Sequence, residues 1–448
     1  MNARSRARVS SAPQISTIED LSHEGRGVTH HDGKVVFIED ALPGERVEWL
    51  RTKRGPNFDE ARLLKVLEPS PDRVTPKCVH FGVCGGCASQ HLSSDRQIEF
   101  KQRQLTDALA RIGKVSPPRI LEPLQADAWN YRRRARLGAR WVPKKQRVVV
   151  GFKERSTSYI ADLQRCEILR PPVDAMIPAL SALLTSLSIP NRIPQIEVSV
   201  ADAAVALVIR VLEPLTAADM EHLHAFEKAH DVRIYLQPGG YETVAPLRSD
   251  LPPLTYALPQ FDVTLQFLPT DFVQVNGPLN ELMVDRVIQL LQLTAEDTVL
   301  DLFCGLGNFS LPLARRAKHV VGVEGEASLV ARARDNAARN GLTNTEFFTA
   351  NLAAEDLQTS GWAKRRYDKV LLDPPRAGAL EALPVVAATR PNRIVYVSCH
   401  PGTLARDAGV LVNQLGYELT EAGVMDMFPH TAHVESVAVF ERIQKKKK

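Results

Sequence analysis

The sequence predicts an α/β fold with a doubly wound, Rossmann-like sheet in its C-terminal part, an α+β middle domain and a small N-terminal β-barrel. Apolar runs alternate with helical patterns between residues 299 and 398, which is typical of repeated βα units. Short β-rich segments with turn residues fill residues 15–68, and prolines within 69–76 end that region. We therefore expect domains at residues 12–70, 74–262 and 265–444.

The N-terminal domain is expected to contain five short strands, at Gln14–Ile18, Gly25–Val28, Lys34–Ile38, Arg46–Leu50 and Ala61–Leu67. Asp32-Gly33 and Pro43-Gly44 are turn signals between them, and this pattern fits an OB-like barrel. The turns at Gly25–Val28 and Ala41–Arg46 resemble those of the TRAM domain, and this resemblance implies RNA binding. The charge of the domain is near neutral, so RNA binding rests here on the resemblance.

Three cysteines follow this domain in the spacing Cys78-x5-Cys84-x2-Cys87. In a protein without an export signal, such a group indicates a metal site rather than disulfide bonds. Three thiolates do not complete a tetrahedral site, and His80, His91 or the distant Cys166 could supply a fourth ligand. The spacing alone leaves zinc and an iron-sulfur cluster open.

The middle of the chain is strongly basic. Residues 96–170 hold 18 Lys and Arg against 7 Asp and Glu, although the whole chain has a net charge of only +4. Such a surplus suits a polyanion, because lysine and arginine displace counterions from phosphates. Arg132-Arg133-Arg134 and Arg136 lie among Trp129, Tyr131 and Trp141, whose rings could stack on unpaired bases. A solvated basic strand is the alternative.

Helices and strands alternate irregularly in this middle domain. Apolar spacing predicts helices at Asp95–Arg111, Val173–Leu187 and Ala217–His230, and strands within 129–158 and 196–212. The pattern is that of an α+β domain.

The C-terminal domain is expected to begin with a helix at Leu279–Leu293. Buried strands are then expected at Val299–Phe303, Val320–Glu324, Thr345–Ala350, Lys369–Asp373 and Arg393–Ser398, with helices at Phe309–Ala317 and Ala327–Asn340. Such folds bind ligands at the carboxyl ends of their strands.

Residues whose side chains could bind a ligand or take part in catalysis lie at these strand ends. A glycine loop spans Asp301–Asn308, Glu324 ends the second strand and is placed to bind ribose hydroxyls, and Cys399 ends the fifth strand like a nucleophile. The loop does not have the G-x-G-x-x-G spacing of NAD sites, and the stiff acidic turn at Asp373–Arg376 favours S-adenosylmethionine. The ordinary alternative for Cys399 is a small packing residue.

Four motifs together resemble the RNA (uracil-C5)-methyltransferases, and in particular their 23S rRNA branch. They are Asp301–Phe309, Leu372–Gly378, Val397–Asp407 and His433–Ser436, and the TRAM turns and the cysteine set support the same resemblance. It implies a Rossmann-like methyltransferase domain, an OB-like TRAM barrel and an α+β iron-sulfur middle domain.

The resemblance also implies ligands and roles. It assigns a [4Fe-4S] cluster to Cys78, Cys84, Cys87 and Cys166, and S-adenosyl-L-methionine to Gln274, Phe303, Asn308, Glu324, Asn351 and Asp373. Cys399 is expected to add to C6 of a uracil, and Glu435 is the candidate for the base that removes the C5 proton. Because C6 is inaccessible in a stacked helix, the 23S rRNA uridine has to be flipped or looped out.

Alternatives and whole-chain properties complete the prediction. A cytosine-C5 methyltransferase is disfavoured because the Asp373–Arg376 turn has no cysteine. Two alternatives stay open. The enzyme could methylate a different or a second 23S rRNA uridine, or the chain could be an RNA-binding iron-sulfur protein with an inactive methyltransferase domain. No apolar run reaches about 18 residues and no signal peptide is evident, so we expect a cytoplasmic monomer without membrane contact. Residues 1–12 and Lys445–Lys448 are expected to be disordered.

Overall fold

The structure is a computed structural model that describes residues 12–354 and 357–444. Disorder was predicted for residues 1–12 and Lys445–Lys448; apart from residue 12, these residues lie outside the described part of the chain. The chain divides into two compact units, residues 1–101 with 153–161 and 428–433, and residues 102–152 with 162–427 and 434–448. No helix among the described residues is long and apolar enough to cross a membrane.

The first unit contains a six-stranded sheet in the order β1-β5-β6-β4-β3-β2. Its strands are β1 (Gln14–Thr17), β2 (Asp20–Leu21), β3 (Gly27–His31), β4 (Lys34–Glu39), β5 (Arg46–Arg54) and β6 (Phe58–Glu68). The prediction of five strands missed β2, because two residues carry no alternation pattern. Among the described strands no pairing joins β1 to β2, so closure into a barrel stays a prediction.

Buried and more exposed residues alternate along β5, and the buried ones belong to the core beneath this sheet. Val47 and Trp49 are fully buried, and the residues beside them on the strand are partly or fully exposed, as expected for a strand with one face on a core. The Trp49 indole Nε1 donates to Ser16 Oγ at 3.1 Å, so the ring is buried with its polar atom satisfied.

The second unit contains two larger sheets. The middle sheet has the order β13-β12-β11-β10-β8-β9. Its strands are β8 (Arg134–Val142), β9 (Arg147–Gly151), β10 (Gln195–Val200), β11 (Val205–Arg210), β12 (Val232–Gln237) and β13 (Ala245–Pro246), with helices α2 (Val173–Ser186) and α3 (Ala217–His230). Both helices lie where the sequence predicts them.

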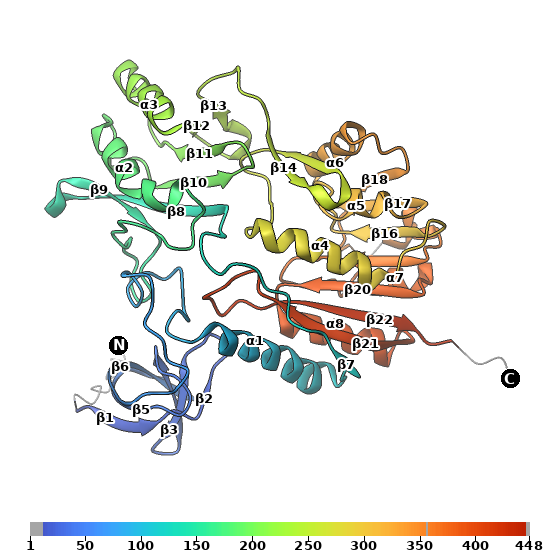
Figure 1. Cartoon of the computed structure of the whole chain (residues 1–448), viewed down its shortest axis with the longest axis horizontal. Helices are drawn as coiled ribbons and strands as arrows, with labels where there is room; N and C mark the ends of the chain where they lie inside the picture. The colour runs from blue at the N-terminus through green and yellow to red at the C-terminus, as the bar shows by residue number, and fades with distance from the viewer. Residues whose placement is uncertain (1–11, 355–356, 445–448) are drawn as a thin grey trace, which may run out of the picture. The chain divides into compact units, whose positions relative to one another are not determined.

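The third sheet has eight strands in the order β18-β17-β16-β19-β20-β22-β21-β7 (Figure 1). They are β7 (Arg119–Ile120), β16 (Thr298–Leu302), β17 (His319–Glu324), β18 (Thr345–Thr349), β19 (Lys369–Leu372), β20 (Arg393–Ser398), β21 (Tyr417–Met425) and β22 (Glu435–Arg442). From β18 to β20 all pairings are parallel, but β22 is antiparallel to β20. The βα repeats predict a doubly wound parallel sheet, and the structure shows that β22 makes it a mixed one.

Helices accompany this sheet as the βα pattern requires. They are α4 (Gly277–Leu291), α5 (Ser310–Ala314), α6 (Ala327–Arg339), α7 (Leu383–Thr389) and α8 (Pro401–Asn413). The helix predicted at 309–317 is shorter than expected. A hairpin of β14 (Leu254–Leu258) and β15 (Val263–Phe267), which the sequence analysis did not predict, precedes α4. The predicted helix at 95–111 is α1 (Ser94–Ala108), continued by a π-helical turn at Leu109–Gly113.

Candidate active site

The predicted residues converge on one edge of the eight-stranded sheet. Phe303 follows β16, Glu324 ends β17, Asp373 follows β19 and Cys399 follows β20. These strands are parallel, so their carboxyl ends share one edge. Glu435 begins the antiparallel strand β22, and the register pairs Ser398 with Ser436, which brings Glu435 to the same edge beside Cys399.

The loop after β16 has a strained backbone. Phe303 has a φ of 65°, which is unusual for a residue with a side chain, and Gly305 and Gly307 have φ values of 55° and 101°. Glycine is favoured at position 307 by this φ, and a Cβ atom there would also lie 2.4 Å from Leu311 Cδ1, so that the leucine side chain would have to shift. Strained backbone of this kind clusters at ligand sites.

Glu324 holds this loop in place. Its Oε2 atom accepts from the backbone N–H of Gly305 at 3.1 Å, and its Oε1 atom accepts from Gly325 at 2.7 Å. The carboxylate therefore lies against the glycine loop, the position that a ribose-binding acid occupies in such folds.

Asn308, at the end of the loop, is fixed by two residues that the sequence analysis missed. Its Oδ1 atom accepts from Tyr256 Oη at 2.9 Å and from Asn280 Nδ2 at 3.0 Å, and its own Nδ2 donates back to Asn280 Oδ1 at 2.9 Å. Asn280 could have been noticed, because it falls on the apolar face of α4 with Val284 and Val287.

Four acidic side chains, those of Asp301, Glu324, Asp373 and Glu435, lie near enough at this edge of the sheet to influence one another's charge. Burial, followed by the charges of Asp373 and Glu324, raises the pKa of Asp301 to about 7. Burial also raises the pKa of Asp373 to about 7, and burial with the charge of Asp373 raises the pKa of Glu435 well above its ordinary value. Perturbed carboxyl groups of this kind are typical of catalytic sites.

The Cys399 thiol belongs to the same cluster. Its pKa is raised to about 11 by burial first and then by the negative charges of Glu435 and Asp373, while Arg376 acts in the opposite direction. The thiol is therefore protonated at neutral pH, and a nucleophilic role requires that a neighbouring group takes its proton.

A buried network fastens the acidic turn to the helix that follows Cys399. Asp407 of α8 is fully buried, and its Oδ2 atom accepts from Ala379 N at 2.8 Å and from Tyr396 Oη at 2.7 Å. Thr403 Oγ1 donates to the carbonyl of Arg376 at 3.2 Å. The loop that carries Asp373 is thereby held beside the loop that carries Cys399 (residues 373–379 and 399–403).

The two remaining predicted cofactor residues lie in connecting segments. Gln274 precedes α4, and its backbone carbonyl accepts from Arg133 Nε at 2.7 Å. Asn351 follows β18 by two residues, is exposed, and accepts from Ala353 N through its Oδ1 atom at 3.1 Å.

The predicted cluster ligands are divided between the two units. Cys78, Cys84 and Cys87 lie in the first unit and Cys166 in the second. Gly86 N donates to Cys84 Sγ at 3.4 Å, and burial, with a contribution from Cys78, raises the pKa of Cys84. Within residues 12–354 and 357–444, no group of three or more His, Cys, Asp or Glu side chains is arranged to hold a metal ion. The ligand set stays a prediction.

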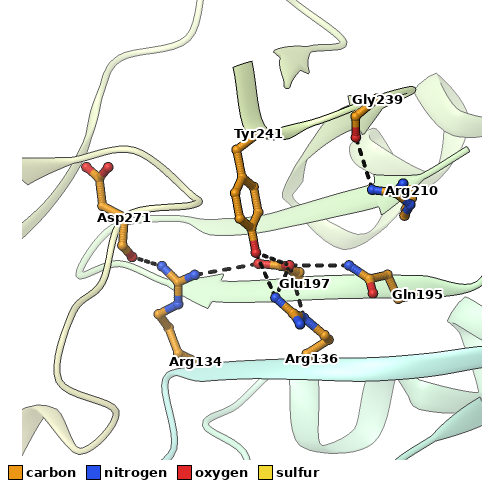
Figure 2. A network of polar contacts seen from close by, with 8 residues as sticks. All are labelled: Arg134, Arg136, Gln195, Glu197, Arg210, Gly239, Tyr241 and Asp271. Carbon is orange, nitrogen blue, oxygen red and sulfur yellow. Dashed lines mark hydrogen bonds and ion pairs between the residues drawn. The ribbon is translucent and has the colours of Figure 1, made fainter. Parts of the chain in front are cut away.

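The predicted RNA-binding arginines are largely used within the protein. Arg133 is buried, and Figure 2 shows Arg134 and Arg136 converging on Glu197 of β10. Arg136 Nη2 lies 2.8 Å from Glu197 Oε1, and Arg134 Nη2 lies 3.7 Å from Glu197 Oε2. The Arg134 side chain is thus largely enclosed, whereas the Arg136 side chain is 58% exposed, a difference that a count of charges cannot reveal.

Comparison with known proteins identifies the family. Residues 93–443 match the family described as tRNA (Uracil-5-)-methyltransferase, and residues 17–53 match the TRAM domain. A solved structure of the Pyrococcus abyssi tRNA (uracil-54, C5)-methyltransferase in complex with S-adenosyl-L-homocysteine has a TM-score of 0.74 at 24% identity, over 95% of this chain and 100% of that chain. This likeness confirms the methyltransferase fold.

Two relatives are similar over nearly their whole length. The 23S rRNA (uracil(1939)-C(5))-methyltransferase RlmD of Stenotrophomonas maltophilia (strain K279a) is 52% identical over 443 residues, which cover 98% of this chain and 100% of the relative. The protein of the same name from Xanthomonas campestris pv. campestris (strain 8004) is 53% identical with the same coverage. The chain belongs to the tRNA (uracil-5-)-methyltransferase family.

Proposed function

We propose that this protein transfers a methyl group from S-adenosylmethionine to C5 of a uridine in 23S rRNA, with uridine 1939 as the target that the names of its relatives indicate. The observation that carries the proposal is the identity of 52–53% over 98% of the chain, together with a thiol and a buried carboxyl group side by side at the carboxyl edge of the sheet.

Cys399 is the proposed nucleophile. Its thiolate adds to C6 of the uracil, and the electron pair of the C5–C6 bond moves to give an enolate with a nucleophilic C5. S-adenosylmethionine supplies the methyl group that C5 takes. The Cys399 thiol, whose pKa is raised to about 11, must first lose its proton, and Glu435 and Asp373 are the carboxyl groups whose charges act on it.

Glu435 is the proposed base for the second half of the reaction. It removes the proton from C5 after methylation, the electron pair of that bond restores the C5–C6 double bond, and the Cys399 sulfur leaves as thiolate. Glu435 has to be ionised to act in this step, and its raised pKa makes the ionised form a stronger base than an ordinary carboxylate.

The cofactor is proposed to lie along the strained loop and its neighbours. Glu324 would bind the ribose hydroxyls, and Asp373 would hold the amino group of the cofactor or the edge of the uracil. The other proposed contacts are Gln274, Phe303, Asn308 and Asn351. The rings and carboxylates at this edge provide both apolar surface and hydrogen-bond acceptors, as an adenosine derivative requires.

A [4Fe-4S] cluster on Cys78, Cys84, Cys87 and Cys166 is a separate proposal. The segment with the first three cysteines is folded tightly: Gly82 has a φ of 89°, and a Cβ on Gly85 would lie 2.9 Å from the carbonyl of Lys153. Thiolates that accept from backbone N–H groups, as Cys84 does from Gly86, suit cluster ligation. An anaerobic preparation should be brown with broad visible absorbance, and a colourless preparation with bound zinc would refute the cluster.

RNA binding through the TRAM domain and a flipped or looped-out uridine complete the proposal, since C6 cannot be reached inside a stacked helix. We also propose that the enzyme acts as a monomer, which size-exclusion chromatography with light scattering tests.

The test of function compares wild type with C399A on 23S rRNA from a strain that lacks the enzyme. Wild type should form 5-methyluridine at one position, mapped by mass spectrometry, and C399A should form none while it keeps its RNA affinity. A C399A protein that still methylates would refute the mechanism. An unmodified rRNA with wild type would point instead to an inactive methyltransferase domain.

A further inference from the structure

We propose that Arg133, immediately before β8 of the middle sheet, is a positioning residue that fixes two parts of the cofactor site, Gln274 and Asn308. The inference rests on the proposed function, which assigns both residues to S-adenosylmethionine. In this inference Arg133, one of the consecutive arginines at 132–134, supports the cofactor site rather than contacting RNA directly.

The first connection runs from Arg133 to the segment before α4. Its Nε atom donates to the carbonyl of Gln274 at 2.7 Å, and its backbone N–H donates to the carbonyl of Val275 at 2.8 Å. Two consecutive carbonyls are thus held by one residue, which leaves the Gln274 backbone little freedom.

The second connection runs through Tyr256 to the glycine loop. The Arg133 guanidinium lies 4.5 Å from the centre of the Tyr256 ring, and Tyr256 Oη donates to Asn308 Oδ1 at 2.9 Å. Both side chains are buried, at 4% and 2% exposure, so the stacking is not weakened by solvent. One guanidinium therefore contacts Gln274 directly and Asn308 through Tyr256, and so connects two of the proposed cofactor residues.

Two further arginines, Arg134 and Arg332, hold the segment of residues 268–275 that contains Gln274. Figure 2 shows Arg134 donating to the carbonyl of Asp271, with Glu197 on its other side. The Asp271 carboxylate in turn pairs with Arg332 Nε at 2.6 Å and accepts from Leu268 N at 2.7 Å. The residues from 268 to 275 are thereby held at several points by side chains of the second unit.

Stability alone does not explain a guanidinium at position 133. Its Nη2 atom is buried without a hydrogen-bond partner among the described residues, and no ion pair with a carboxylate compensates for its burial in the part of the chain that the structure describes. Arg133→Met removes this incompletely satisfied charge, but it also leaves the Gln274 carbonyl without its side-chain donor, and an unpaired buried acceptor costs about 1–3 kcal/mol. The variant should therefore fold with a modestly lowered Tm at most, and a loss of cofactor affinity in the folded protein would reveal the positioning role.

The experiment measures binding of S-adenosylhomocysteine by calorimetry and steady-state kinetics on rRNA. For R133M we expect a rise of about ten-fold in Kd and in KM for S-adenosylmethionine, with a change in kcat of less than about three-fold. Y256F, which loses only the hydroxyl that reaches Asn308, should show a smaller rise. The matched control is R140M, because Arg140 is an exposed arginine of strand β8, which begins directly after Arg133.

A double variant separates positioning from general damage. If Arg133 acts through Asn308, R133M/N308A should bind S-adenosylhomocysteine more tightly than the product of the two single effects predicts. An R133M protein with wild-type Kd and KM would overturn the inference, and so would a loss of kcat alone. If R133M does not fold, R133K and Y256F carry the same test. Wild type that fails to bind S-adenosylhomocysteine would instead overturn the proposed function, and this inference with it.

Discussion

The charge environment of Cys399 leads to a quantitative prediction for the variant Glu435→Gln. A pKa of about 11 instead of 9.0 leaves about 100-fold less thiolate at pH 8 than an ordinary cysteine would have. Wild-type Cys399 should therefore react with iodoacetamide about 100-fold more slowly than a peptide thiol. Burial is the larger cause of the shift and remains in the variant, so removing the Glu435 charge should accelerate the reaction by about three- to ten-fold.

The assay is a timed alkylation from pH 7 to 10.5 in which mass spectrometry quantifies the peptide that contains Cys399. Glu441→Gln is the matched control, because Glu441 lies on the same strand β22 at its far end and pairs with Arg393. Its alkylation profile should coincide with that of wild type. A wild-type Cys399 as reactive as a free thiol at pH 8, or an E435Q profile identical to that of E441Q, would refute the reasoning about this cluster.

Three further predictions concern the framework of the site. Asp407→Asn should disturb the buried acceptor that holds the acidic turn, lower stability by about 1–3 kcal/mol and reduce kcat, as measured by thermal melting and by methylation assays. Gly307→Ala should weaken S-adenosylhomocysteine binding and lower Tm, because a φ of 101° and a 2.4 Å approach to Leu311 disfavour a Cβ atom; a Tm and a calorimetric Kd equal to those of wild type would contradict this. The folded-state pKa of Asp301 is raised to about 7 from 3.8, so the stability that its proton contributes is full below pH 3.8 and is lost as pH rises toward 7. Between pH 5 and pH 8 the free energy of unfolding of Asp301→Asn should therefore rise relative to that of wild type by about 2–3 kcal/mol, as measured by denaturant titration at each pH. An unchanged difference would show that Asp301 is not buried as an acid.

The parallel part of the methyltransferase domain could be predicted from the sequence because its strands are continuous apolar runs. Val320–Glu324 and Arg393–Ser398 match β17 and β20 to within one residue, and the residues at their ends arrive at one edge as parallel pairing requires. The antiparallel strand β22 could not be placed by the same pattern, because alternation does not specify strand direction. Yet this reversal is what brings Glu435 to Cys399.

The polar contacts between residues far apart in the sequence could not be predicted from the sequence. Tyr256 lies in a hairpin whose turn at Pro259–Phe261 was not recognised as a connection between two strands, so its contact with Asn308 was missed. Arg133 appeared as one charge in a basic run, and only the structure shows that Gln274, far along the chain, accepts its hydrogen bond. Charge and periodicity describe a residue's own surroundings in sequence, whereas these contacts depend on the tertiary fold.

Covalent capture of a uracil is the decisive measurement for the proposed chemistry. An rRNA fragment with 5-fluorouridine at the target position should form a complex with the protein that survives denaturing electrophoresis, because fluorine at C5 cannot leave as a proton does and the sulfur cannot depart. Mass spectrometry should locate the methylated 5-fluorouracil adduct on Cys399, and C399A should form none. A wild-type protein that methylates ordinary rRNA but never becomes linked to the fluorinated RNA, or becomes linked through another residue, would contradict the nucleophilic role of Cys399.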